Sequence, residues 1–107
     1  MIWHVDYTDD ALEDLQGIYE YIAFNLLEPV TAAKQSGRIM DAADSLNELP
    51  FRYPLYHKEP WRSKGLRFMP VDNYMVFYLP DKSTGIVTII RIMYGARDIE
   101  RHLDADI

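Results

Sequence analysis

Four residues that could act on a phosphate lie in two apolar stretches of this sequence. Arg91 interrupts the run IIRIMYGARD, in which Tyr94 and Arg97 follow, and Arg67 stands in the earlier run GLRFMPV. A guanidinium stays charged and can bind a phosphate through two parallel hydrogen bonds, and a phenol can hydrogen-bond a phosphate or pass a proton. Two interpretations of Arg91 stay open: it binds a phosphate, or it pairs with Asp98 or with an acid on a helix.

A second group of cations and aromatic residues lies in and just after the proline-rich stretch PFRYPLYHKEPWRS, which has no clear helical or strand periodicity. His57, Lys58, Arg62 and Lys64 stand among tyrosines and Trp61, as on surfaces that stack RNA bases, so these four are candidate RNA-binding residues. Alternatively, the stretch is a cover whose aromatic residues pack on a sheet while its cations are solvated. For Trp61 we favour packing.

We expect no metal and no cofactor. His4, His57 and His102 lack the spacing of metal ligands, and the chain has neither a cysteine nor a glycine-rich phosphate loop. The absence of cysteine also favours an intracellular location. The first residues lack the pattern of a secretory signal, and no apolar run approaches the length of a membrane span. A cytoplasmic protein without a membrane partner is therefore expected.

Charge divides this chain of 107 residues into an acidic part and a basic part. Residues 1–50 carry ten acidic and two basic side chains, residues 51–103 carry nine basic and five acidic ones, and two further aspartates bring the net charge to −6. The total charge argues against a nucleic-acid partner. Its distribution, however, joins a basic half to an acidic half, and each half needs its own explanation.

The periodicity of apolar residues predicts a single α+β domain over residues 1–107. Two antiparallel N-terminal helices pack on one face of an antiparallel β-sheet, in the order β-α-α-β-β-β-(short α), and the other face is less covered. Thr8 is the expected N-cap of the first helix, and Pro29 opens the second. The expected strands are Ile2–Tyr7, Gly65–Val71, Asn73–Leu79 and Gly85–Tyr94, and the short terminal helix is Ala96–Leu103.

Simple alternation along the last strand places Arg91 on one face with Val87, Ile89 and Met93. Ile90, Ile92 and Tyr94 then face the other way. Because Gly95 can turn the chain at the strand end, we expect Tyr94 to return toward the cleft that Arg91 and Arg67 share.

The order of elements and several short motifs together resemble the RelE/ParE toxins of type II toxin–antitoxin systems, the plasmid stabilisation protein family. The resemblance covers nearly the whole chain, and the order and spacing of the motifs support it more than any single motif does. The motifs are LEDL and IYEYI in the first helix, PWR followed by GLR, the strand YMVFY, and the terminal RIMYGARD.

This resemblance implies a cytoplasmic toxin that a cognate antitoxin holds inactive, but it does not imply one activity. RelE-like members cleave mRNA in the ribosomal A site, whereas ParE-like members inhibit DNA gyrase and are not nucleases. We expect mRNA cleavage without a metal, with ribosome and mRNA as partners. Arg67 and Arg91 then bind the phosphate, Arg97 supports them, and Tyr94 is the acid or base. The alternatives are a gyrase inhibitor, or a degenerate toxin that only binds its antitoxin.

Overall fold

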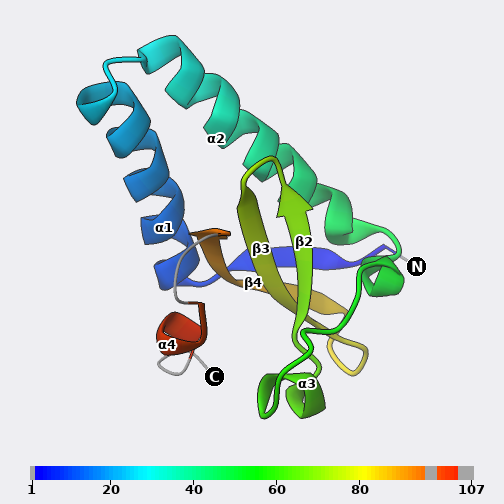
Figure 1. The fold of residues 1–107 in the computed structure, drawn as a ribbon. Coiled ribbons are helices and arrows are strands. Elements are labelled where there is room, and N and C mark those ends of the chain that lie inside the picture. The colour runs from blue at the N-terminus through cyan, green and yellow to red at the C-terminus, as the bar shows by residue number, and fades with distance from the viewer. Residues whose placement is uncertain (1, 96–98, 104–107) are drawn as a thin grey trace.

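A four-stranded β-sheet lies at the centre of the computed structural model, which describes residues 2–95 and 99–103 (Figure 1). Its spatial order is β1-β4-β3-β2, with β1 at His4–Tyr7, β2 at Arg67–Val71, β3 at Tyr74–Asp81 and β4 at Ile86–Tyr94. The predicted α+β class and order of elements are confirmed. The sheet is mixed, however, because β1 and β4 pair in parallel, whereas β2, β3 and β4 form an antiparallel meander.

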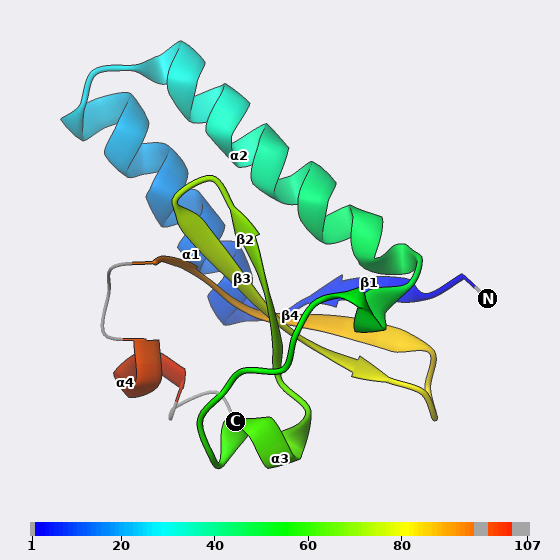
Figure 2. The ribbon, with the colours of Figure 1, turned by 45° about the vertical axis from the view of Figure 1, so that its right-hand side comes forward.

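Two long helices cover one face of this sheet as a hairpin that extends beyond it (Figure 2). Helix α1 spans Asp9–Glu20 and continues into a π-helical turn at Tyr21–Asn25, and α2 spans Pro29–Asp44. Both predicted starts are correct: the Thr8 hydroxyl accepts the Ala11 N–H at 3.0 Å, and proline occupies the first turn of α2. Buried residues of α1 and α2 form the main core with residues of all four strands.

The opposite face of the sheet, which we expected to be less covered, carries a smaller second core. The chain between α2 and β2 holds two 3₁₀ turns, Ser45–Asn47 and Pro50–Arg52, and the short helix α3 at Trp61–Lys64. The C-terminal helix α4 spans Ile99–Leu103, inside the predicted range. Tyr56, Trp61 and Leu103 form a second core against Phe77 and Met93, so the packing predicted for Trp61 is confirmed.

A β-bulge in β4 corrects the predicted alternation of its side chains. Tyr78 of β3 is opposite Ile89, but Phe77 is opposite Arg91, so Ile90 is an extra residue in β4. The extra residue reverses the alternation, which brings Ile92 into the helix-side core with Val87 and Ile89. Ile90 and Met93 belong to the second core instead. Arg91 lies opposite Phe77, so its side chain starts from the face away from α1 and α2.

The Thr8 hydroxyl joins α1 to the sheet, since it caps the helix and also donates a hydrogen bond to the Ile90 carbonyl at 2.8 Å. We predict that Thr8→Ala lowers the free energy of unfolding by about 1–2 kcal/mol. Thr8→Ser, which keeps the hydroxyl, should change it by less than about 0.5 kcal/mol. Urea denaturation of both variants measures the difference, and equal stabilities would contradict this role of the hydroxyl.

Candidate functional site

Arg91 forms a bidentate ion pair with Asp14 of α1. Its Nε donates to Asp14 Oδ2 at 2.7 Å and its Nη2 donates to Oδ1 at 2.8 Å, while Nη1 donates to the His102 carbonyl in α4 at 3.3 Å. The two side chains are only 14% and 12% exposed. Asp14 Oδ2 also accepts the Ile92 N–H at 2.9 Å. Of the two interpretations of Arg91, the structure therefore shows pairing with a helix acid.

The Arg67 guanidinium also bonds to other groups of the protein, but not beside Arg91. Its Nη1 donates to the carbonyls of Tyr53 and Phe51 at 2.6 and 3.3 Å, and its guanidinium lies 5.0 Å from the centre of the Phe51 ring. Arg67 lies opposite Tyr78, whose side chain belongs to the helix-side core. Arg67 and Arg91 thus start from opposite faces of the sheet, and the structure does not bring them together in one cleft.

Tyr94 is exposed at the end of β4, where its ring makes an edge contact with Tyr74 at 5.7 Å between ring centres. Burial raises the pKa of Tyr74 above its usual value, and the neighbouring Tyr94 and Tyr21 add to the shift. Tyr74 therefore remains a neutral hydrogen-bond donor at neutral pH. Arg97 lies outside the described residues, so its predicted role stays a prediction.

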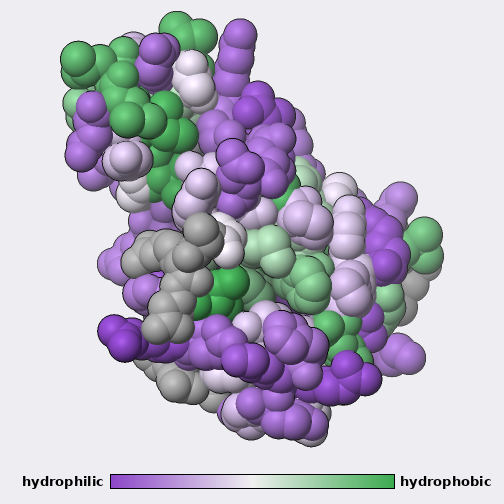
Figure 3. All heavy atoms as spheres, viewed as in Figure 1, coloured by the Kyte–Doolittle hydropathy of each residue, from purple (hydrophilic) through white to green (hydrophobic). Residues whose placement is uncertain are grey.

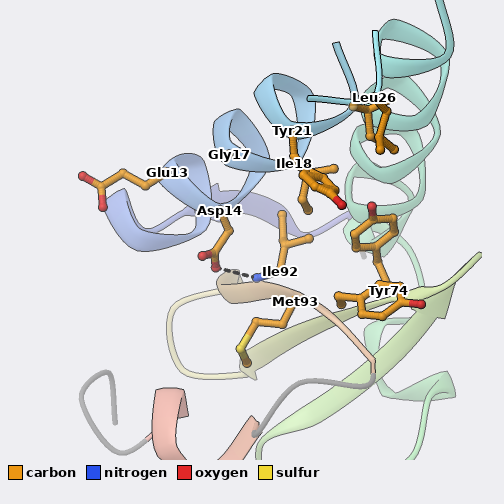
Figure 4. A pocket seen from close by; sticks show the side chains of 11 residues that line it. Glu13, Asp14, Gly17, Ile18, Tyr21, Leu26, Tyr74, Ile92 and Met93 are labelled. Atoms are coloured by element: carbon orange, nitrogen blue, oxygen red, sulfur yellow. Dashed lines mark hydrogen bonds between the residues drawn. The ribbon is translucent and has the colours of Figure 1, made fainter. Parts of the chain in front are cut away.

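A groove of about 680 Å³ runs between α1 and the end of β4 (Figure 4). Its walls are mostly apolar, formed by Ile18, Tyr21, Leu26, Tyr74, Ile92 and Met93. Glu13 and Asp14 add acidic groups at one end, and Gly17 leaves open space on the helix side. Tyr94 also lines the groove and is the one predicted catalytic residue found there among the described part of the chain. Such a surface suits a polypeptide better than a phosphate.

The four predicted RNA-binding residues lie on and before α3, away from this groove, and all four are exposed. Lys58 forms an ion pair with Glu100 of α4 at 2.8 Å, and this contact lowers the pKa of the Glu100 carboxyl. The His57 ring lies against Tyr56, 4.8 Å between ring centres. Arg62 and Lys64 are in the last turn of α3. Their proposed contact with RNA stays a prediction.

The far end of the helical hairpin exposes a group of large apolar side chains. Figure 3 shows this end as green surface at the upper left. The exposed apolar residues there are Tyr21, Phe24, Leu26, Leu27 and Val30. The sequence analysis did not identify this group. Phe24 and Leu27 stand among other apolar residues in the run IAFNLLEPV, and this concentration was the available signal for an exposed apolar surface.

Within the described part of the chain, no cluster of three or more His, Asp or Glu side chains is placed to hold a metal ion. None of the described helices is long and apolar enough to span a bilayer. The candidate site consists of the two surfaces described above, the α1–β4 groove and the exposed end of the hairpin.

Comparisons with known proteins agree with this fold. A structure of a chromosomal ParDE toxin–antitoxin system from P. aeruginosa has a TM-score of 0.71 at 20% identity, covering 87% of this chain and 96% of that one. The RelBE2 toxin–antitoxin complex from M. tuberculosis gives 0.63 at 20%, covering 88% and 99%. A mutant of the E. coli toxin RelE in the free state gives 0.66 at 11%, covering 99% and 94%. At these identities the similarity shows the fold.

No curated protein matches the sequence. The family described as "ParE toxin of type II toxin-antitoxin system, parDE" matches residues 5–99, which include both long helices and all of the four strands except His4 of β1. The predicted resemblance is thus confirmed: this chain belongs to the ParE toxin family of type II toxin–antitoxin systems.

Proposed function

We propose that this toxin is neutralised by a cognate antitoxin and acts by binding DNA gyrase, without cleaving RNA. The observation that supports this most strongly is the ion pair between Arg91 and Asp14, which occupies the guanidinium that RNA cleavage would require. The match to the ParE family supports the same choice, because the resemblance described above implies that ParE-like members inhibit gyrase and are not nucleases. Similarity to solved toxin–antitoxin complexes supports the antitoxin as a partner.

Moving Arg91 from Asp14 to a phosphate is energetically unfavourable. Separating a largely buried pair leaves an uncompensated charge and costs about 3–5 kcal/mol. Arg91 would lose two charge-assisted hydrogen bonds to Asp14, and Asp14 would be left with the Ile92 N–H alone. A phosphate would have to offset this cost before it gained any binding energy. The pair therefore favours a positioning role for Arg91, between α1 and β4.

A protein target fits the remaining exposed surface. Phe24 and Leu27 are 69% and 78% exposed at the end of the hairpin. Large exposed apolar side chains grouped in this way mark protein interaction sites.

One observation favours the second candidate, ribosome-dependent mRNA cleavage. Tyr94 is 46% exposed at the mouth of the groove, and a phenol there could take part in proton transfer. The catalytic roles of Arg67, Arg91, Tyr94 and Arg97 therefore remain part of this alternative.

Two purified assays separate the candidates. We expect the chain to inhibit DNA supercoiling by gyrase, and to leave mRNA intact on ribosomes with an occupied or empty A site. Supercoiling gels and primer extension of the mRNA measure the two outcomes. Codon-phased mRNA ends together with unaffected gyrase would reject our proposal in favour of cleavage. No effect in either assay would leave a chain that only binds its antitoxin, and would also reject it.

The exposed end of the hairpin should contribute to gyrase inhibition. We predict that Phe24→Asp raises the half-inhibitory concentration at least tenfold, because it places a charge in an apolar contact. Leu12→Asp is the matched control, since Leu12 is 50% exposed on α1 outside the hairpin end. Both variants should keep their unfolding midpoints within a few degrees. Equal inhibition by the two variants would contradict a role for this surface.

The positioning role of Arg91 predicts a specific pattern of stability. Arg91→Gln and Asp14→Asn should each lower the free energy of unfolding by about 3 kcal/mol, because each leaves a buried charge unpaired. The double variant should cost clearly less than the sum of the two, with a coupling energy of about 1–3 kcal/mol. Chemical denaturation measures all three. A catalytic Arg91 would instead give a stable Arg91→Gln variant that has lost toxicity.

A further inference from the structure

The charges of this chain are separated in space as well as in sequence. Helices α1 and α2 and the turn between them, residues 9–44, carry eight acidic and two basic side chains, whereas residues 50–64 and 79–88 carry five Lys or Arg side chains and two acidic ones. Figures 1 and 2 show α3 and the turn after β3 at the end of the molecule opposite to the turn between α1 and α2. The molecule extends 43 Å along its longest axis and therefore has an acidic helical hairpin and a distant basic end, formed by residues 50–64 and 79–88.

Two lysines from separate segments meet at one hollow of the basic end. Lys64 is the last residue of α3, and Lys82 follows the end of β3. Both line a hollow of about 520 Å³ together with Thr88, whose hydroxyl can donate a hydrogen bond. Asp81 also lines the hollow, but its carboxylate accepts the Ser83 N–H at 2.9 Å and the Ser83 hydroxyl at 2.7 Å. Two ammonium groups and a hydroxyl beside one hollow form a surface for an oxyanion such as a phosphate.

The large aromatic rings of the basic end are engaged with groups of the protein itself. Tyr56 and Trp61 are buried in the second core. The Phe51 ring centre is 5.1 Å from Lys82 Nζ, and the Tyr53 ring centre is 5.1 Å from an arginine guanidinium. Recognition of unpaired RNA bases uses open aromatic faces, whereas contact with a nucleic-acid backbone uses charges alone. The basic end therefore fits the phosphates of a duplex better than it fits unpaired bases.

We propose that the basic end contacts the backbone of the duplex DNA on which gyrase acts, with Lys64 and Lys82 each binding a phosphate and Arg62 of α3 adding to the positive charge. This inference rests on the gyrase part of the proposed function. The exposed apolar end of the hairpin binds the gyrase protein, and the basic end, on the opposite side of the molecule, reaches the DNA. Phosphate contacts carry no sequence information, so this contact adds affinity without a preferred DNA sequence.

The net charge of −6 makes this contact dependent on gyrase. The acidic hairpin is repelled by DNA, which turns the basic end toward the duplex. A few phosphate contacts on an acidic protein give a dissociation constant for free DNA on the order of 10⁻⁴ M or weaker. When gyrase holds the hairpin end, the DNA contact becomes intramolecular, and a high effective concentration compensates for the weak affinity. We therefore expect contact with DNA in the gyrase complex and little binding to DNA alone.

Tethered cleavage tests the position of the DNA. The chain has no cysteine, so a single introduced cysteine can carry an iron chelate that cuts nearby DNA. Thr84→Cys places the chelate two residues after Lys82, and Gln16→Cys on α1 is the matched control, since both positions are exposed. With gyrase and a duplex present, we expect cuts from position 84 and at least tenfold fewer from position 16. Without gyrase the cuts from position 84 should disappear.

Equal cutting from positions 84 and 16, or cutting that does not need gyrase, would overturn the proposed contact. The absence of cuts from position 84 in a labelled chain that still inhibits supercoiling would overturn it as well, while leaving gyrase as the target. If the unmodified chain does not inhibit gyrase, the proposed function fails, and this inference fails with it.

A pair of double variants tests the two lysines. Changing Lys64 and Lys82 together to glutamine removes both charges, and changing both to arginine keeps them. We expect the glutamine variant to raise the half-inhibitory concentration for supercoiling about tenfold, and to lower the slope of its logarithm against the logarithm of salt concentration by roughly two. The arginine variant should behave like the unmodified chain. Any result in which the two variants inhibit alike would overturn the phosphate contact.

Discussion

The carboxylate of Asp14 is the group on which the arrangement around the site depends. One oxygen accepts hydrogen bonds from Arg91 Nε and from the Ile92 N–H, and the other accepts from Arg91 Nη2. The same guanidinium reaches the His102 carbonyl in α4. A single side chain of α1 thereby fixes the helix to the edge of β4 and, through Arg91, to the C-terminal helix. Asp14 thus joins the two elements that form the walls of the groove.

The bulge at Ile90 decides from which face of the sheet Arg91 reaches Asp14. Without the extra residue, Arg91 would follow Ile89 and Val87 into the helix-side core, where a charged side chain would lack polar partners. The bulge turns Arg91 to the face away from α1 and α2, and from there its guanidinium reaches Asp14 at the edge of β4. At the same time Ile92 enters the main core. A local change of one residue therefore decides which side chains of β4 join each core, and it places Arg91 on the face opposite to Arg67. The acidic first half of the chain supplies the partner of Arg91, since Asp14 is one of its ten acidic residues.

Much of the fold was predictable from local sequence patterns. Thr8 before two aspartates, Pro29 at a helix start and the β-branched runs mark element boundaries by mechanisms that act within a few residues. The bulge was not predictable, because it depends on how β3 and β4 pair. The parallel pairing of β1 with β4 and the choice of Asp14 as the partner of Arg91 were missed for the same reason. Asp14 is 77 residues away in sequence, and several other acids were equally available. The groove arises only when both elements are in place.

The central claim is that Arg91 is committed to Asp14 and is not available to a phosphate. The most direct measurement is nitrogen-15 NMR of the Arg91 Nε–H in the folded chain, titrated with a short RNA that lacks the attacking 2′-hydroxyl. Our account predicts a slowly exchanging Nε–H signal at neutral pH that does not move as RNA is added. A signal that shifts in proportion to bound RNA, with loss of its protection from exchange, would contradict the account.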